Sequence, residues 1–231
     1  MVGGGKNESP AVWVYQGGQF VKISTIVIDS VLTDYSTAVL DQTYTISWAS
    51  KGQYFVAFTF SDRTFVYNMT TNLWHEQKST LLNDAGVPTT GRWRAASLVN
   101  AYGYNIVGDI QDGRIGILSP DTYQEYEIDI IRVFTTMPIA NKGNRIRVPA
   151  IELTMEAGVG NGIFNPAVSM AISEDSKRFD YERTRRIGKV GRFKHRAIWR
   201  KNGRIPRFAV LKFRLSDPVK PVVIKLEADI V

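Results

Sequence analysis

Short runs of aromatic and β-branched residues, each ended by a turn sequence, restrict the fold of this chain more than any other feature. No long segment shows the i, i+3, i+4, i+7 spacing of apolar residues that marks an amphipathic helix. Strand-favouring residues cluster instead between turn sequences such as Ser50-Lys51-Gly52 and Gln111-Asp112-Gly113. Of the 231 residues, 44% are hydrophobic and 22% are charged, so the chain has enough apolar side chains to form buried hydrophobic cores. We therefore predict an all-β globular protein.

The first half contains two sets of short strands with the same order of strands and turns. A hairpin at 13–23, with its turn at Gln16-Gly17-Gly18-Gln19, precedes them. Corresponding strands lie about fifty residues apart, and four strands in ~40–50 residues is the repeat of a β-propeller blade. The predicted strands are 44–48, 54–60, 64–68 and 73–76, then 92–100, 104–108, 114–118 and 123–127. We predict a partial β-propeller of about two blades plus the hairpin over residues 1–130, with a β-sandwich of chance spacing as the alternative.

Two blades do not close a propeller, which ordinarily has about four or more. Either this chain is the C-terminal part of a longer polypeptide, or its open blades pack on another chain. Both possibilities predict exposed apolar edges on the chain when it is alone.

The second half, residues 131–231, changes to regular alternation of apolar and polar residues. Such alternation with one polar face suits an antiparallel sandwich with a solvated side. Pro218 and Pro221 flank the entry to the last strand, where a missing N–H does little harm. The alternating apolar sets are Ile151, Leu153 and Met155; Val168, Met170 and Ile172; and Val222, Ile224, Leu226, Ala228 and Ile230. We predict an antiparallel β-sandwich here.

Positive charge is concentrated in the second half. Residues 1–140 hold nine basic and thirteen acidic residues, whereas 141–231 hold twenty basic and nine acidic. The stretch 177–214 alone has fifteen Lys or Arg against Asp180 and Glu182. Within it, 195–200 and 209–215 have strand patterns, and Lys201-Asn202-Gly203-Arg204 has the composition of a tight turn. We predict a basic two-stranded hairpin.

The cations of this stretch are the candidate contact residues, interleaved with Phe193, Trp199 and Phe208. Three interpretations stay open: contact with nucleic-acid phosphates through counterion release, docking onto an acidic partner subunit, and a solvated face. The candidates for subunit or DNA contact are Arg183, Arg185, Arg186, Lys189, Arg192, Lys194, Arg196, Arg200, Lys201, Arg204 and Arg207.

Catalytic and metal-binding patterns are scarce. Absence of cysteine removes disulfides and thiolate metal sites, and two histidines, His75 and His195, make a histidine-built metal site improbable. The Gly-rich 158–162 segment lacks the Lys-Ser/Thr of a phosphate loop, and 173–176 has the composition of a hairpin turn. Acidic residues alternate on a predicted strand, at Glu125, Glu127 and Asp129. This spacing fits either the two catalytic carboxylates of a glycoside hydrolase or a solvated strand edge. We predict no catalytic residues, no cofactor and no metal, and the sequence has no apolar run of the ~18 residues needed for a membrane span.

Three sequence motifs resemble those of a known family. They are WHE at 74–76, Gly108-Asp109 with Asp112-Gly113-Arg114, and above all RRIGKVGRFKHRAIWRKNGRIPRFAVLKFRLSDPVK at 185–220. The chain is similar, from about residue 12 to 228, to the tail hub (nozzle) proteins of short-tailed bacteriophages, also called packaged DNA stabilisation proteins. Family members are roughly twice this length, with a β-propeller followed by a β-sandwich, so the resemblance covers their C-terminal half.

The resemblance implies a structural role in the virion tail, with assembly in the host cytoplasm. Family hubs form a homo-hexameric ring below the portal and its head-to-tail adaptor, extend the channel through which DNA passes, and help to retain the packaged genome until ejection. Tail fibres, spikes or a needle attach to them. A head-to-tail ring requires heterologous interfaces, and we expect the arginines to dock subunits.

Two other functions are considered alongside this one. A carbohydrate-active propeller enzyme predicts a pocket with convergent acids, and alanine at Glu125 and Glu127 abolishing turnover. A stand-alone nucleic-acid-binding β module predicts DNA affinity that falls steeply with salt.

Overall fold

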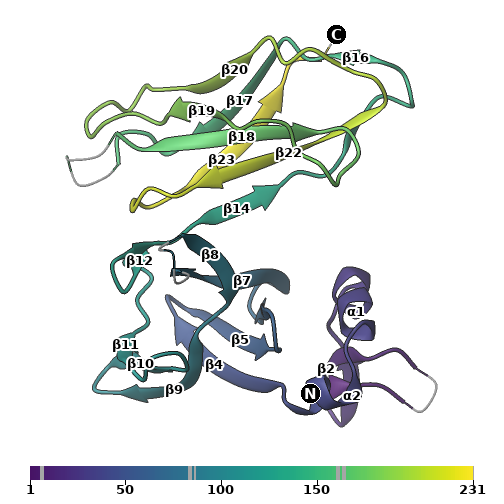
Figure 1. The fold of residues 1–231 in the computed structure, drawn as a ribbon, viewed down its shortest axis with the longest axis vertical. Helices are drawn as coiled ribbons and strands as arrows, with labels where there is room; N and C mark the ends of the chain where they lie inside the picture. The colour runs from purple at the N-terminus through teal and green to yellow at the C-terminus, as the bar shows by residue number, and fades with distance from the viewer. Residues whose placement is uncertain (6–7, 83–84, 86, 160–161, 163–164, 231) are drawn as a thin grey trace. The chain divides into compact units, whose positions relative to one another are not determined.

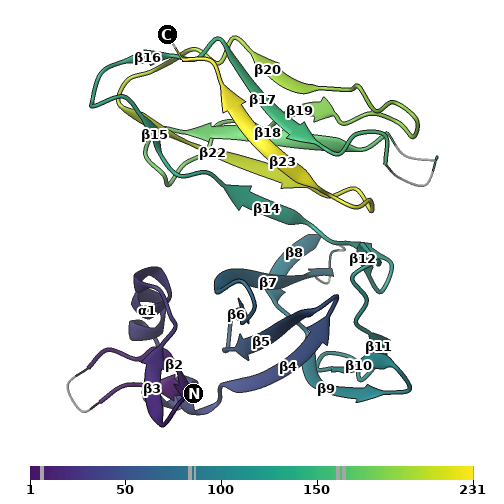
Figure 2. The same ribbon diagram turned by 180° about the vertical axis from the view of Figure 1, so that it is seen from behind.

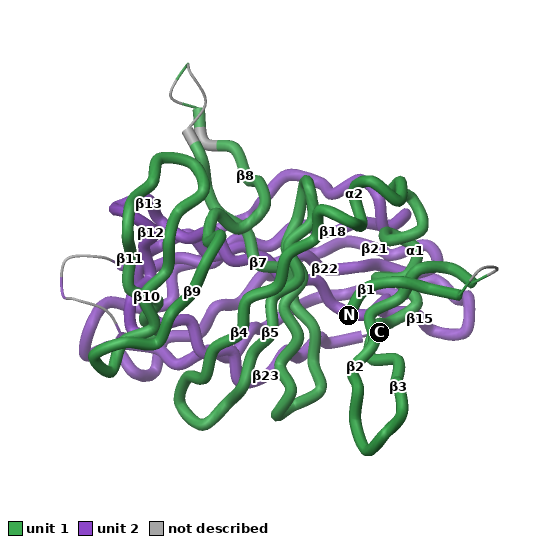
Figure 3. The backbone as a smooth tube through the Cα atoms, turned by 90° about the horizontal axis from the view of Figure 1, so that it is seen from below, with its two compact units in different colours: residues 1–120 green, residues 121–231 purple. Residues whose placement is uncertain are grey.

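A computed structural model describes residues 1–5, 8–82, 85, 87–159, 162 and 165–230 (Figures 1 and 2). The chain divides into two compact units, residues 1–120 and 121–231 (Figure 3). Both units are built mainly from antiparallel strands, as predicted.

The first unit is organised around an antiparallel sheet of order β4-β5-β6-β7-β8. All four strands predicted for the first set are present in it, and β7 extends further than expected. Tight turns join them, with Lys51 and Asn72 in the left-handed region at φ 48° and 57°. The strands are β4 Tyr44–Ser50, β5 Gln53–Thr59, β6 Thr64–Asn68, β7 Leu73–Leu82 and β8 Pro88–Arg92.

The second set forms a smaller sheet of order β11-β10-β9. The single strand predicted at 92–100 is wrong, because the chain leaves the central sheet after Arg92 and joins the next sheet at Ala95. Between them, Trp93 and Arg94 are buried, so the strand breaks where the chain crosses from one layer to the other. The strands are β9 Ala95–Ala101, β10 Tyr104–Asp109 and β11 Ile115–Ile117.

The prediction that 123–127 supplies a fourth strand to this sheet is also wrong. Instead, β12 (Gln124–Glu125) pairs only with β13 (Ile128–Asp129) among the described strands. Tyr126 and Glu127 turn the chain between them at φ 47° and 73°. Two consecutive residues in the left-handed region form a tight hairpin turn, and Asn and Gly are the residues usually found there. Because Tyr126 and Glu127 are not typical turn residues, the sequence did not indicate this turn.

A third layer holds the only two helices of the described chain, α1 (Ile26–Thr33) and α2 (Thr37–Asp41). No helix is predicted here from the sequence, because eight and five residues are too short to show helical periodicity. These helices accompany a sheet of order β1-β2-β3, which contains the predicted N-terminal hairpin. Its strands are β1 Val2–Gly3, β2 Ala11–Gln16 and β3 Gln19–Lys22.

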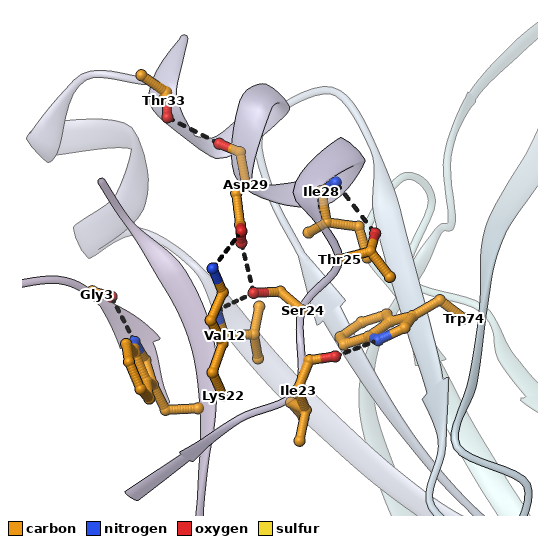
Figure 4. Close-up of polar contacts among 11 residues, drawn as sticks. Gly3, Val12, Lys22, Ile23, Ser24, Thr25, Ile28, Asp29, Thr33 and Trp74 are labelled. Atoms are coloured by element: carbon orange, nitrogen blue, oxygen red, sulfur yellow. Dashed lines mark hydrogen bonds and ion pairs between the residues drawn. The ribbon is translucent and has the colours of Figure 1, made fainter. Parts of the chain in front are cut away.

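Polar contacts fix α1 to the hairpin and to the central sheet (Figure 4). The Thr25 hydroxyl caps the helix by accepting from the Ile28 N–H at 3.4 Å. Asp29 accepts from the Ser24 hydroxyl and pairs with the Lys22 ammonium, both at 2.5 Å. The Trp74 indole N–H of β7 donates to the carbonyl of Ile23 at 2.8 Å. A cap, an ion pair and an indole hydrogen bond therefore set the position of a helix too short to be stable alone.

The central sheet is covered on both faces. One face packs Phe58 and Tyr67 against Ile28 and Leu32 of α1, and the other packs Ala57 and neighbouring residues against the β9–β11 sheet. Figures 1 and 2 show β4 and β5 between the helices and β9–β11. The unit is thus a stack of three layers with the β4–β8 sheet in the middle.

The second unit is the predicted sandwich. One sheet has the order β14-β22-β18-β19, with β15 also pairing to β22; the other has the order β20-β17-β23. Trp199 of β20 and Phe213 of β22 are fully buried, and their rings meet edge-on at 5.7 Å. The strands are β14 Arg132–Thr135, β15 Ile139–Ala140, β16 Ile146–Arg147, β17 Ala150–Met155, β18 Ala167–Ser173, β19 Arg183–Arg186, β20 Ala197–Arg200, β21 Arg204–Ile205, β22 Phe208–Leu215 and β23 Val223–Ala228.

The predicted basic hairpin does not exist. β20 pairs with β17 in one sheet, whereas β22 pairs with β14, β15 and β18 in the other. Residues 201–207 have turn chemistry, with Lys201 at φ 59° and Gly203 at φ 84°, but they carry the chain across the sandwich. The cause is packing, because Trp199 and Phe213 both point into one core, and two sheets facing each other bury both rings.

The last strand also differs from its prediction. Leu226 and Ala228 pack against the core as expected, but Ile224 is 63% exposed. The register of β17 and β23 shifts between Thr154 and Met155, so Ile224 is an extra residue on β23. Such a bulge disrupts the alternation of side chains, and this accounts for the exposure of Ile224.

Candidate docking surface

The eleven candidate cations lie in three places on the sandwich rather than on one hairpin. β19 and β20 form one edge, the loop 187–196 lies at one end of β20, and the connection 201–207 lies at its other end. Every candidate side chain is exposed except that of Arg183, which is half-buried. The charge therefore extends from one end of the sandwich to the other along a single edge.

The arginines of β19 hold that edge together. The Arg185 guanidinium donates to the carbonyl of Ile198 on β20 at 2.8 Å, and Arg186 donates to the carbonyl of Asn165 at 2.8 Å. In the opposite direction, the Trp199 indole N–H of β20 donates to the carbonyl of Arg183 at 2.5 Å. The Arg185 and Trp199 bonds link the two sheets, and the Arg186 bond ties β19 to the segment before β18 of its own sheet. Arg185 and Arg186 therefore stabilise the sandwich.

Arg196 belongs to a mixed-charge row and not to a basic patch. Its guanidinium makes a bidentate pair with the Glu152 carboxylate of β17, and this pairing lowers the pKa of Glu152 below its usual range. Glu227 of β23 lies directly across from Glu152. Together with Arg200 and Asp229, these residues line an open groove of about 510 Å³.

The loop 187–196 presents cations around an exposed aromatic ring. Phe193 is 74% exposed, and the loop carries Lys189, Arg192 and Lys194 around it. The loop passes close to Gly158, since a Cβ there would lie 2.8 Å from the Phe193 ring and 3.2 Å from the Arg192 backbone. The loop thus presents an exposed ring together with its cations.

Two arginines face each other at the opposite end of the sandwich. β16 and β21 pair so that Arg147 lies directly across from Arg204, while Ile146 and Ile205 are buried on the other side. Like charges in this arrangement repel. Arg147 was not among the candidates, because fifty-seven residues separate it from Arg204 in the chain; only the strand pairing brings them together.

The cations therefore fall into two classes. Arg183, Arg185, Arg186 and Arg196 donate to carbonyl, amide or carboxylate oxygens of the same unit. The others make no ion pair with any residue that the structure describes: Arg147, Lys189, Arg192, Lys194, Arg200, Lys201, Arg204 and Arg207.

The acidic candidates do not converge. Glu125 lies across from Ile128, and Glu127 lies in the turn of the β12–β13 ribbon, so the predicted alternation along a strand is wrong. Asp129 accepts from the Gln124 amide at 2.8 Å. In the 173–176 turn, Asp175 accepts from the backbone N–H of Lys177 at 2.8 Å, which makes it a turn residue. Gly160 and Asn161 of the glycine-rich segment lie outside the described residues.

The described part of the chain contains no group of three or more His, Cys, Asp or Glu residues that could hold a metal ion. None of its helices is long and apolar enough to cross a membrane.

Comparison with known families agrees with this arrangement. Residues 1–123 match the family described as bacteriophage P22 Gp10, beta-propeller, and residues 131–231 match the family described as bacteriophage P22 Gp10, beta-sandwich. No curated protein matches the chain. The two matches cover both structural units and most of the sequence. This chain therefore belongs to the bacteriophage P22 Gp10 family, the non-enzymatic tail nozzle proteins of the phage virion that retain packaged DNA.

Proposed function

We propose that the free cations at the two ends of the sandwich dock this chain onto acidic surfaces of neighbouring tail subunits. The partners in this proposal are further copies in a homo-hexameric ring, the head-to-tail adaptor below the portal, and the fibre, spike or needle proteins. The proposal places the boundary between the propeller-type and sandwich domains at residue 130, in the interval between the two family matches.

The observation that carries this proposal is the pairing of Arg147 with Arg204. These like charges lie directly opposite each other on paired strands, which is destabilising, and neither arginine has an ion pair with a residue that the structure describes. A carboxylate from a partner would replace this repulsion with attraction, because it can form bidentate hydrogen bonds with either guanidinium group.

DNA is the competing ligand for these cations. A channel wall that held DNA through many free cations would resist its exit, because each phosphate contact adds to the affinity. Docking between proteins agrees better with a nozzle through which DNA must leave.

Reversing both charges tests the proposal. The Arg147→Glu/Arg204→Glu variant should lose ring formation and binding to the adaptor, measured by sedimentation velocity and electron microscopy with the purified adaptor. Lys177→Glu/Arg178→Glu is the matched control, because both residues are exposed elsewhere on the sandwich and the net change in charge is the same. The control should assemble like the parent chain.

Two outcomes overturn subunit docking. One is normal assembly of the Arg147→Glu/Arg204→Glu variant. The other is tight binding of a DNA duplex by the parent chain, falling steeply with salt and lost in the same variant, which assigns these cations to DNA.

A further inference from the structure

The loop 187–196 exposes apolar side chains among its cations. Phe193 and Val190 are 74% and 49% exposed. Lys189, Arg192 and Lys194 lie next to them in the chain, and these three cations make no ion pair with any residue that the structure describes. No residue from 187 to 196 is acidic. The exposed surface of this loop is therefore both cationic and apolar.

Hydrogen bonds fold this loop into two successive turns. The Arg192 N–H donates to the Lys189 carbonyl at 2.9 Å, and the His195 N–H donates to the Arg192 carbonyl at 3.4 Å. Ile187, at the start of the loop, is buried, and its N–H donates to the Pro166 carbonyl at 2.7 Å. Because the loop is folded before a partner arrives, less conformational entropy is lost on binding.

The Phe193 ring stands at a hollow that the loop itself forms. Residues 191–195 line this hollow, which has a volume of about 410 Å³. One side of the ring lies close to Gly158, since a Cβ there would lie 2.8 Å from it, and most of the ring is exposed to water. A side chain that enters the hollow can therefore contact the ring while its neighbours in the partner chain lie near Arg192 and Lys194.

We propose that the loop 187–196 binds a segment of a neighbouring tail protein in which an aromatic or aliphatic side chain stands between acidic residues. This inference rests on the docking function proposed above and adds an apolar part to the recognition. The apolar side chain packs on Phe193 in the hollow, and the flanking carboxylates pair with Arg192 and Lys194. Buried aromatic residues and arginines are the side chains that most often dominate the binding free energy of protein interfaces.

Nucleic acid and anionic membranes also attract cations, but they fit this loop less well. Single-stranded nucleic acid stacks successive bases on several aromatic side chains, whereas Phe193 is the one aromatic residue between 187 and 196. Anionic lipid is typically recognised by clusters of about four to eight Lys or Arg residues, whereas Lys189, Arg192 and Lys194 make three free cations here. An acidic protein segment with an apolar side chain matches both features of the loop.

Two synthetic peptides test the proposal on the full chain. Labelled Gly-Asp-Glu-Trp-Glu-Asp-Gly should bind roughly tenfold tighter than Gly-Asp-Glu-Ser-Glu-Asp-Gly in fluorescence anisotropy, because only the first can bury a ring against Phe193. Both affinities should fall as NaCl rises, while their ratio persists, because screening acts on the charges and not on the ring contact. Equal affinities, or no binding of either peptide, overturn the proposal.

A change at the ring tests the site of binding. Phe193→Ser should remove the preference for the Trp peptide, and Phe193→Leu should keep part of it. Tyr181→Ser is the matched control, since Tyr181 is an aromatic residue of the same unit that is 76% exposed, and it should keep the full preference. Unchanged thermal melting shows that each variant is folded. A preference that persists in Phe193→Ser overturns the role assigned to this ring.

Oligothymidine and vesicles that contain phosphatidylglycerol are measured as competing ligands. Tighter binding of either one than of the Trp peptide, lost in Phe193→Ser, assigns the loop to that ligand and overturns the proposal.

Assembly with the purified adaptor separates this inference from the docking function on which it rests. The Arg147→Glu/Arg204→Glu variant changes the other end of the sandwich and should keep the preference for the Trp peptide. Normal assembly of Phe193→Ser, with assembly lost in Arg147→Glu/Arg204→Glu, overturns the apolar recognition and leaves subunit docking in place. Normal assembly of both variants overturns both.

Discussion

The two units of this chain leave different kinds of surface unsatisfied. The sandwich closes one core between two sheets, around Trp199 and Phe213, and what remains without a partner is charge. The stacked sheets of the first unit bury both faces of their middle layer, and what remains is apolar surface, with Ile115 and Phe20 exposed. The way in which each core closes thus decides what a unit leaves exposed, which is charge on the sandwich and apolar side chains on the stacked sheets.

The largest expected effect is on the sandwich core. Trp199→Ala removes a fully buried ring and its hydrogen bond to the Arg183 carbonyl, and should lower the free energy of unfolding of the second unit by about 3–5 kcal/mol. Calorimetry of the full chain should show the transition of the second unit shifted to lower temperature and that of the first unit unchanged. Equal shifts in both would show that the two units unfold together.

In the first unit, a buried ion pair has the corresponding role. Arg94 pairs with the fully buried Asp109 and with Asp112 at 2.8 Å, which fixes the crossing from β8 to β9. Arg94→Met leaves the Asp109 carboxylate buried without its partner and should lower the free energy of unfolding of this unit by about 3 kcal/mol. Adding Asp109→Leu should restore part of the loss in urea unfolding. A double variant less stable than the single one contradicts this explanation.

A smaller effect separates structural cations from free ones. Arg185→Ala loses its hydrogen bond to the Ile198 carbonyl and should lower the free energy of unfolding by about 1 kcal/mol. Arg204→Ala removes the repulsion with Arg147 and should raise it by about 0.2–0.5 kcal/mol. Urea unfolding at low salt compares the two variants, and equal losses in both refute the division into two classes.

The smallest effect is a pH dependence in the first unit. Hydrogen bonds from the Arg114 side chain and backbone, and from Arg94, lower the pKa of Asp112 from 3.8 to about 2. The stability contributed by this carboxylate is present above about pH 4 and is lost as the pH falls towards 2. In the Asp112→Asn variant, the melting temperature of the first unit should fall less over this pH range than it does in the parent chain. An unchanged profile shows that other groups cause the acid transition.

Local features were predictable where a strand carries its own signals. The tight turn at Gly17-Gly18 and the alternation of Leu211 and Phe213 each lie within a few residues, and the structure confirms both. The helix α1 could have been found from its Thr25 cap, but eight residues show too little periodicity to outweigh the strand signals around them. The Tyr126-Glu127 turn had no composition signal at all.

The sequence by itself determined that the chain is mostly β, that it has two differently charged halves, and which family it resembles, because composition, turn spacing and motifs are local properties. Only the tertiary structure decided that β20 and β22 belong to different sheets, that Arg147 meets Arg204, and that Arg185 is structural. Strand partners are chosen by which side chains can share one core, and that choice joins residues far apart in the chain.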